Sequence, residues 1–157
     1  MADEVQANSA PRGMYPGRFD DRGRVKLPVK FQQYLAGLPE KTLFVTSLDR
    51  KIAQIYPISV WRQNEDFLST YRSNPRLAKR LAFNAADLGV ETEMDAQGRI
   101  TFPPELRREL GLEEQPVKLW GLKGRIDILS EKLYEEKKAE ALVTEEEIDQ
   151  AISDGLF

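Results

Sequence analysis

The sequence predicts an α+β protein in which one β-rich unit occurs twice and helices follow each copy. Three observations lead to this prediction: a duplicated motif, short runs of alternating apolar and polar residues, and apolar residues at helical spacing after each unit. The chain has 157 residues, of which 41% are apolar and 31% charged, which is an ordinary globular composition. A chain of this length can bury a single core without covalent cross-links.

The duplication is visible as a motif that returns after 75 residues. Residues 20–31 read DDRGRVKLPVKF, and residues 95–106 read DAQGRITFPPEL. The apolar positions of the first copy stay apolar in the second. The identical pairs are Asp20 and Asp95, Gly23 and Gly98, Arg24 and Arg99, and Pro28 and Pro103.

Each copy predicts the same order of elements. The Asp-x-x-Gly-Arg segment is expected to form a tight turn, because aspartate accepts backbone N–H groups and glycine allows a positive φ. The alternation that follows predicts a strand with Val25 and Leu27 inward and the cations beside them outward. A proline then ends the strand and opens a short helix. The predicted helices are 28–35 and 104–110, and the later strands are 43–46, 52–56, 117–121 and 125–129.

Three short strands cannot enclose a core by themselves. The two copies are therefore expected to pair their hairpins into one small barrel with pseudo-two-fold symmetry. Further helices are predicted at 57–70, 75–86 and 131–142, and Thr144 with the glutamates after it predicts a capping box. The predicted divisions are a disordered extension at 1–13, units at 14–56 and 91–130, a helical linker at 57–90, and C-terminal helices at 131–157.

The composition excludes several classes of function. The sequence holds no cysteine and no histidine, which removes disulfides, thiolate metal sites, thiol catalysis and Ser-His-Asp hydrolysis. We expect no catalytic site, cofactor, metal or small-molecule substrate. The remaining enzyme alternative is a magnesium site, which no phosphate-binding glycine loop accompanies. Its carboxylates would be Asp20, Asp21, Glu93 and Asp95. No apolar run approaches the ~18 residues of a membrane-spanning helix, and we expect a cytoplasmic protein without membrane contact.

Charge is distributed unevenly along the chain, although the formal net charge is only −3. Residues 14–91 hold 13 Lys and Arg against 8 Asp and Glu, whereas residues 92–157 hold 9 against 16. This asymmetry indicates a polyanion-binding face in the first half, and a solvated surface with scattered charges is the alternative. The densest cluster of cations is Arg18, Arg22, Arg24 and Lys26.

The doubled Asp-x-x-x-Arg turn, followed each time by apolar-x-apolar-Pro and a helix, resembles the MraZ family of transcriptional regulators over about residues 14–142. Each unit is similar to an AbrB/SpoVT-type swapped-hairpin domain. The resemblance implies a ring-shaped homo-oligomer, octameric or larger, that associates with the nucleoid. It also implies binding to direct repeats in the promoter of the protein's own division and cell-wall gene cluster, mostly as a repressor.

The resemblance further implies that the two loops contact double-stranded DNA. The candidate contacts are Arg22, Arg24 and Arg99, with Lys26 and Arg18 beside them. We assign Asp20, Gly23, Asp95 and Gly98 mainly to the turns themselves. Because the second loop has Gln97 in place of Arg22, it is expected to be the weaker contact.

The sequence leaves a second role open for the two motif arginines. In that role each arginine locks its own loop through the aspartate four residues earlier, and both roles can hold together. At the level of the whole protein, the alternatives are an AbrB/MazE-like antitoxin module and a ring scaffold that binds protein. Trp61, Phe67 and Leu68 provide apolar surface beyond the needs of a small barrel and are candidates for assembly.

Overall fold

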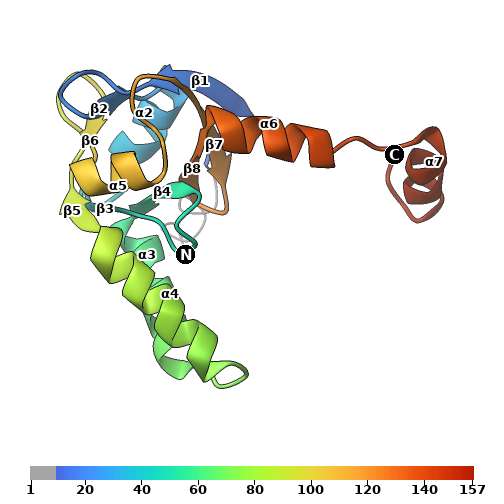
Figure 1. Ribbon diagram of the computed structural model, residues 1–157, viewed down its shortest axis with the longest axis horizontal. Coiled ribbons are helices and arrows are strands. Elements are labelled where there is room, and N and C mark those ends of the chain that lie inside the picture. The colour runs from blue at the N-terminus through green and yellow to red at the C-terminus, as the bar shows by residue number, and fades with distance from the viewer. Residues whose placement is uncertain (1–9) are drawn as a thin grey trace.

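The computed structural model describes residues 10–157 of the chain, and Figure 1 shows the arrangement of its elements. The strands form a six-stranded antiparallel sheet of order β1-β7-β8-β4-β3-β5 and a separate two-stranded ribbon, β2-β6. The first copy of the repeat contains β1 (Met14–Arg18), β2 (Arg24–Lys26), α2 (Val29–Ala36), β3 (Leu43–Thr46) and β4 (Ala53–Pro57), followed by α3 (Ile58–Thr70) and α4 (Pro75–Leu88). The second contains β5 (Val90–Thr92), β6 (Arg99–Thr101), α5 (Pro104–Glu109), β7 (Pro116–Leu122) and β8 (Arg125–Ser130), followed by α6 (Glu131–Glu140) and α7 (Glu145–Ser153).

The strands pair across the two copies of the repeat. The first strand of the first copy, β1, pairs with β7 of the second, and the first strand of the second copy, β5, pairs with β3 of the first. The last strands of the two copies, β4 and β8, pair with each other, as do β2 and β6. Each copy therefore depends on the other for its sheet.

The six-stranded sheet is open, so the predicted closed barrel is wrong, whereas the α+β class is confirmed. Strands β1 and β5 are the two edges of the sheet, and β2 and β6 form a ribbon of their own. The ribbon strands have only three residues each. A proline follows soon after each of them, at Pro28 and Pro103, and its missing N–H cannot extend the ladder.

The main core lies between the sheet, the ribbon, α2 and α5. Val25 of β2 and Ile100 of β6 are fully buried, and the equivalent helix residues Phe31 and Leu106 are fully buried as well. The predicted alternation along the first ribbon strand is confirmed, because Lys26 is exposed between buried neighbours. The core thus fixes which side of the ribbon points to solvent.

Helices α3 and α4 form a hairpin that projects from the body of the molecule (Figure 1). Its base packs on the sheet through Trp61, whose ring lies 4.7 Å from that of Phe44 and 5.1 Å from that of Tyr56. Trp61 is buried, so it packs in the core and is not part of the apolar surface predicted for assembly, and Trp120 is half-buried. The two helices confirm the elements predicted at 57–70 and 75–86.

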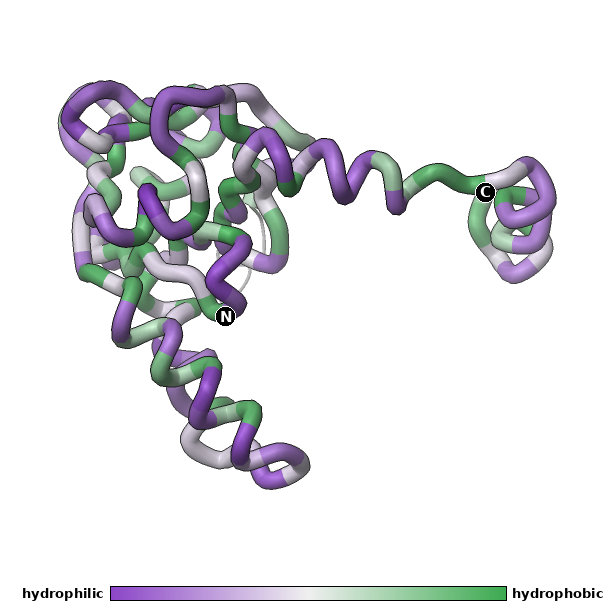
Figure 2. Tube along the Cα trace, viewed as in Figure 1, coloured by the Kyte–Doolittle hydropathy of each residue, from purple (hydrophilic) through white to green (hydrophobic). Residues whose placement is uncertain are grey.

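The C-terminal helices have different surroundings. Helix α6 packs on β7 and β8, and the Ser130 side chain caps its start by accepting from the N–H of Leu133. Helix α7 begins with the predicted capping box between Thr144 and Glu147. Figure 1 shows α7 standing apart from the body, and Figure 2 shows an apolar stretch of chain leading to it.

Of the extension predicted at 1–13, residues 1–9 lie outside the described residues. No described helix is both long and apolar enough to cross a membrane.

Candidate nucleic-acid interface

Both Asp-x-x-x-Arg loops lie at the β2–β6 ribbon, which brings the two copies of the motif together. The register pairs Arg24 with Thr101, Val25 with Ile100, and Lys26 with Arg99. Side chains alternate between the two faces of a strand. Because the central pair is buried, the flanking residues point to the outer face. The outer face of the ribbon therefore carries Arg24, Lys26 and Arg99, which were three of the predicted contacts.

The first loop is held by Asp20. Its Oδ1 accepts from the backbone N–H groups of Arg22 and Arg24, each at 2.9 Å. Its Oδ2 accepts from Nε of Arg24 at 2.8 Å. Gly23 occupies the position of positive φ, at 76°, and donates its N–H to the Asp20 carbonyl. The aspartate therefore fixes both the backbone of the loop and the side chain of its motif arginine.

The second loop repeats this geometry. Asp95 Oδ1 accepts from the N–H groups of Gln97 at 2.9 Å and Arg99 at 2.8 Å, and Oδ2 accepts from Nε of Arg99 at 2.9 Å. Gly98 has a φ of 77°. The loop-locking role left open by the sequence is thus present in both copies. In residues 10–157, Arg24 and Arg99 make their side-chain hydrogen bonds only through Nε.

Each loop is also held by the other copy of the repeat. The N–H of Leu27 donates to the Gly98 carbonyl at 2.9 Å, and the N–H of Phe102 donates to the Gly23 carbonyl at the same distance. Each loop is therefore hydrogen-bonded to the strand end of the other copy, and the two loops form one unit with the ribbon.

Two helix residues that sequence reasoning missed support the loops. Gln32 of α2 and Arg107 of α5 occupy equal positions in the repeat, and each donates to the carbonyl at the end of its own strand. Each also packs against the glycine of the other copy. A Cβ on Gly23 would lie 2.5 Å from the Arg107 guanidinium carbon, and one on Gly98 would overlap the Gln32 amide. The sequence feature that could have identified Gln32 and Arg107 is a long polar side chain at the same repeat position in both helices.

The remaining predicted cations lie beside the first loop. Arg22 is exposed within that loop. The antiparallel bridge between Phe19 and Val25 places Arg18, also exposed, opposite Lys26. In the second copy the position of Arg18 is occupied by Glu93. Apart from Arg99, the cations of this face therefore come from the first copy, and the register places Lys26 and Arg18 at the end of the ribbon that carries Arg99.

The magnesium alternative has no support in the described part of the chain, where no group of three or more carboxylates is placed to hold a metal ion. Asp20 and Asp95 bind the motif arginines instead. Backbone N–H groups, first those of Arg24 and Arg99, lower the pKa of Asp20 and Asp95 below the ordinary value of 3.8. The arginine side chains act in the same direction.

We expect Asp20 and Asp95 to titrate below 3.8 in a carboxyl NMR titration. A lowered pKa in the folded state means that the contribution to stability is complete above the unfolded pKa and is lost as pH falls through the folded pKa. The loops should therefore stay intact at neutral and mildly acidic pH. In an Arg24→Gln control the Asp20 pKa should rise only partly, because the backbone donors remain. An Asp20 pKa at or above 3.8 in the wild type would contradict this geometry.

Comparison with known proteins places the chain in a family. Residues 89–152 match the family model described as "MraZ protein, putative antitoxin-like". A protein named transcriptional regulator MraZ from Acidobacterium capsulatum is 29% identical over 143 residues, covering 91% of this chain and 97% of the relative. Proteins of the same name are 31% identical in Caldanaerobacter subterraneus subsp. tengcongensis, covering 87% and 92%, and 31% identical in Pelotomaculum thermopropionicum, covering 90% and 94%. Two of these relatives thus share at least 30% identity along nearly their whole length, and the chain belongs to the MraZ family.

Proposed function

We propose that this protein is a DNA-binding transcriptional regulator that contacts double-stranded DNA through the outer face of the β2–β6 ribbon and its two loops. The observation that carries the proposal is the convergence of Arg24, Lys26 and Arg99, from both copies of the motif, on that one face. Arginine is suited to the task because its guanidinium can donate two parallel hydrogen bonds to a phosphate or to guanine. The name that the relatives carry, transcriptional regulator, supports the same function.

The aspartate contact and DNA binding are compatible in this arrangement. Asp20 takes only Nε of Arg24, so the two terminal nitrogens of the guanidinium remain as donors. A side chain that is already held in place loses less conformational freedom when it binds. The loop-locking contact therefore prepares the arginine for DNA, and the same argument applies to Asp95 and Arg99.

We further propose that the first loop makes the larger contribution to affinity. Three positions that are cationic in the first copy of the motif are not cationic in the second. Arg18, Arg22 and Lys26 correspond to Glu93, Gln97 and Thr101. Each phosphate contact by a cation adds to affinity through the release of counterions.

The finer parts of the proposal follow the family resemblance. They are a ring, octameric or larger, that is associated with the nucleoid, binds direct repeats at the promoter of its own division and cell-wall genes, and acts there as a repressor. The chain would consist of two AbrB/SpoVT-like swapped-hairpin units, at 14–56 and 91–130, related by a pseudo-two-fold axis. The exchange of β1 and β5 between the two copies supports this last point.

The salt dependence of binding tests the proposal. A ring presents several loops to DNA at once, and their weak contacts add through effective concentration. If a few subunits each neutralise about two phosphates, log K should fall with log salt with a slope on the order of −5 or steeper. Fluorescence anisotropy with a labelled promoter duplex between low and moderate salt measures the slope. An affinity that does not change over this range would exclude a phosphate-dominated contact.

A second candidate function is an antitoxin-like module, which the description of the matching family model favours. In that case the C-terminal helices would bind a protein, and DNA binding by the ribbon would be secondary. Antitoxins of this type have one unit and a long disordered tail, whereas this chain has the motif twice and helices α6 and α7 follow its second unit. Retention of the salt-dependent DNA binding in the absence of any protein partner favours the regulator.

A further inference from the structure

Helix α7 is amphipathic and has no buried residue. Ile148 and Ile152 are 41% and 52% exposed, and Leu156, beyond the helix end, is exposed as well. Leu142 and Val143, in the segment that leads to the helix, are exposed as well. A nine-residue helix is only marginally stable in water by itself. A surface that covers this apolar side would therefore stabilise α7.

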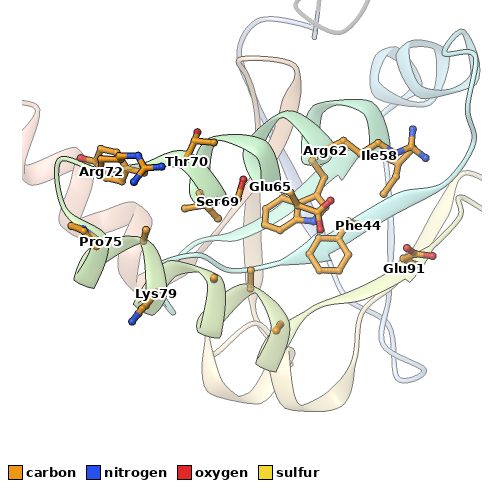
Figure 3. Close-up of a pocket in the computed structure, with 17 residues that line it drawn as sticks. Phe44, Ile58, Arg62, Glu65, Ser69, Thr70, Arg72, Pro75, Lys79 and Glu91 are labelled. Atoms are coloured by element: carbon orange, nitrogen blue, oxygen red, sulfur yellow. The ribbon is translucent and has the colours of Figure 1, made fainter.

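A groove of about 920 Å³ runs between α3 and α4 (Figure 3). Aromatic and aliphatic side chains, among them Phe44, Trp61 and Leu68, line one part of it. Small side chains of α4, including Ala78 and Ala82, line another part. Small residues at a helix surface leave room for the side chains of a second helix to enter. The apolar lining of the groove matches the apolar side of a short helix.

The charges of α7 and of the groove are complementary. Arg72 and Lys79 line the α4 side of the groove, and Arg76 and Arg80 lie on α4 outside the lining. Residues 139–157 have no cation and six carboxylates, five of them at Glu145, Glu146, Glu147, Asp149 and Asp154. The other side of the groove contains Glu65, Glu91 and the cation Arg62, which is paired with Glu40. This pattern favours one orientation, with the acidic side of α7 toward α4.

We propose that α7 of one copy docks into the α3–α4 groove of the next copy. Ile148 and Ile152 would enter the groove, and the glutamates at the start of α7 would face the cations of α4. Its own groove is out of reach, because only residues 141–144 link α7 to α6, and α6 is packed on β7 and β8. In Figure 1 the α3–α4 hairpin and α7 extend from the body in different directions.

A contact between a tail and a groove on different faces is heterologous, so it repeats from copy to copy and closes into a ring when the rotation allows. The inference therefore rests on the ring assembly in the proposed function and identifies the surfaces that would join its subunits. It does not depend on what the ribbon binds.

Two variants test the contact from its two sides. In the tail variant, Ile148→Asp and Ile152→Asp remove the apolar side of α7. In the groove variant, Ala82→Trp fills the groove at an exposed position. Matched controls are Gln150→Asp on α7 and Ala139→Trp on α6, both at exposed positions. Circular dichroism and thermal melting establish that each variant is folded.

Light scattering at micromolar concentration then gives the assembly mass. We expect the wild type and both controls to have the mass of a closed assembly, and each variant alone to have the 18.0 kDa of a monomer. A 1:1 mixture of the two variants should form a dimer of twice that mass. In that dimer the intact tail of the groove variant occupies the intact groove of the tail variant.

The inference is overturned if folded tail or groove variants keep the wild-type mass, or if their mixture stays monomeric. A monomeric wild type overturns both the docking contact and the ring. The salt dependence of its DNA binding then tests whether a single copy contacts DNA through the ribbon. A wild type that assembles as described but does not bind promoter DNA overturns the proposed function alone.

Discussion

The Arg24→Ala protein is expected to bind promoter DNA at least about tenfold more weakly than the wild type while folding and assembling normally. Loss of one arginine contact costs about 1–3 kcal/mol, and 1.4 kcal/mol corresponds to a factor of ten. The loss is repeated in every engaged subunit, so the effect on the assembly is larger than on one copy. The melting temperature should change little, because a partly exposed ion pair such as that of Arg24 with Asp20 contributes little to stability.

Variants of the other loop cations show which of them contribute to DNA affinity. Arg99→Ala should weaken binding less than Arg24→Ala, because its loop has Gln97 where the first loop has Arg22. Arg22→Ala should lower the affinity and flatten the salt slope by about one contact for each engaged subunit. Lys132→Ala, which removes an exposed cation of α6, is the control for net charge. An Arg24→Ala protein that melts early, yet binds DNA normally while it is folded, would show that this arginine only locks its loop.

The Gly98→Ala protein is expected to lose about 1–3 kcal/mol of its free energy of unfolding. Its φ of 77° is unfavourable for a residue with a Cβ, and that Cβ would overlap the Gln32 amide. Gly23→Ala should act similarly through Arg107. Urea unfolding measures the loss, and DNA affinity should fall with it because both loops share the ribbon.

Gly37→Ala is the control for this prediction. Gly37 has a φ of −82°, and a Cβ there would lie 3.4 Å from the nearest atom, the Gln33 carbonyl oxygen, so the change should be small. Adding Gln32→Ala to Gly98→Ala should recover the part of the loss that comes from the overlap. A Gly98→Ala protein as stable as the wild type would contradict the close packing of the second loop on α2.

The sequence was sufficient to predict the local elements and their order. The repeated motif determined where the turns, short strands and helices occur, because each depends on neighbours within a few residues. Thr144 and Glu147 show this best, since their spacing alone identified the capping box that opens α7. The inward direction of Val25 followed from alternation in the same way.

The pairing of strands between the copies could not be predicted from the local alternation of apolar and polar residues. Pairs such as β1 with β7 join residues about a hundred positions apart, and alternation does not indicate the partner. The predicted barrel failed for this reason, because closure depends on which edges meet. Gln32 and Arg107 were missed on similar grounds, since each supports a loop of the other copy. The role of Arg24 stayed open because a spacing of four residues allows either a loop contact or a free cation.

The most direct test of the central claim, that the β2–β6 ribbon is a DNA-binding face, is a titration of the wild type against a labelled duplex from the region upstream of its own gene. Unlabelled duplexes of that sequence and of a shuffled sequence with equal length and composition serve as competitors. We expect saturable binding that the cognate duplex displaces far better than the shuffled one. In a folded protein, Arg24→Ala together with Arg99→Ala should abolish this binding. Binding that persists in that double variant, or no binding by the wild type at low salt, would contradict it.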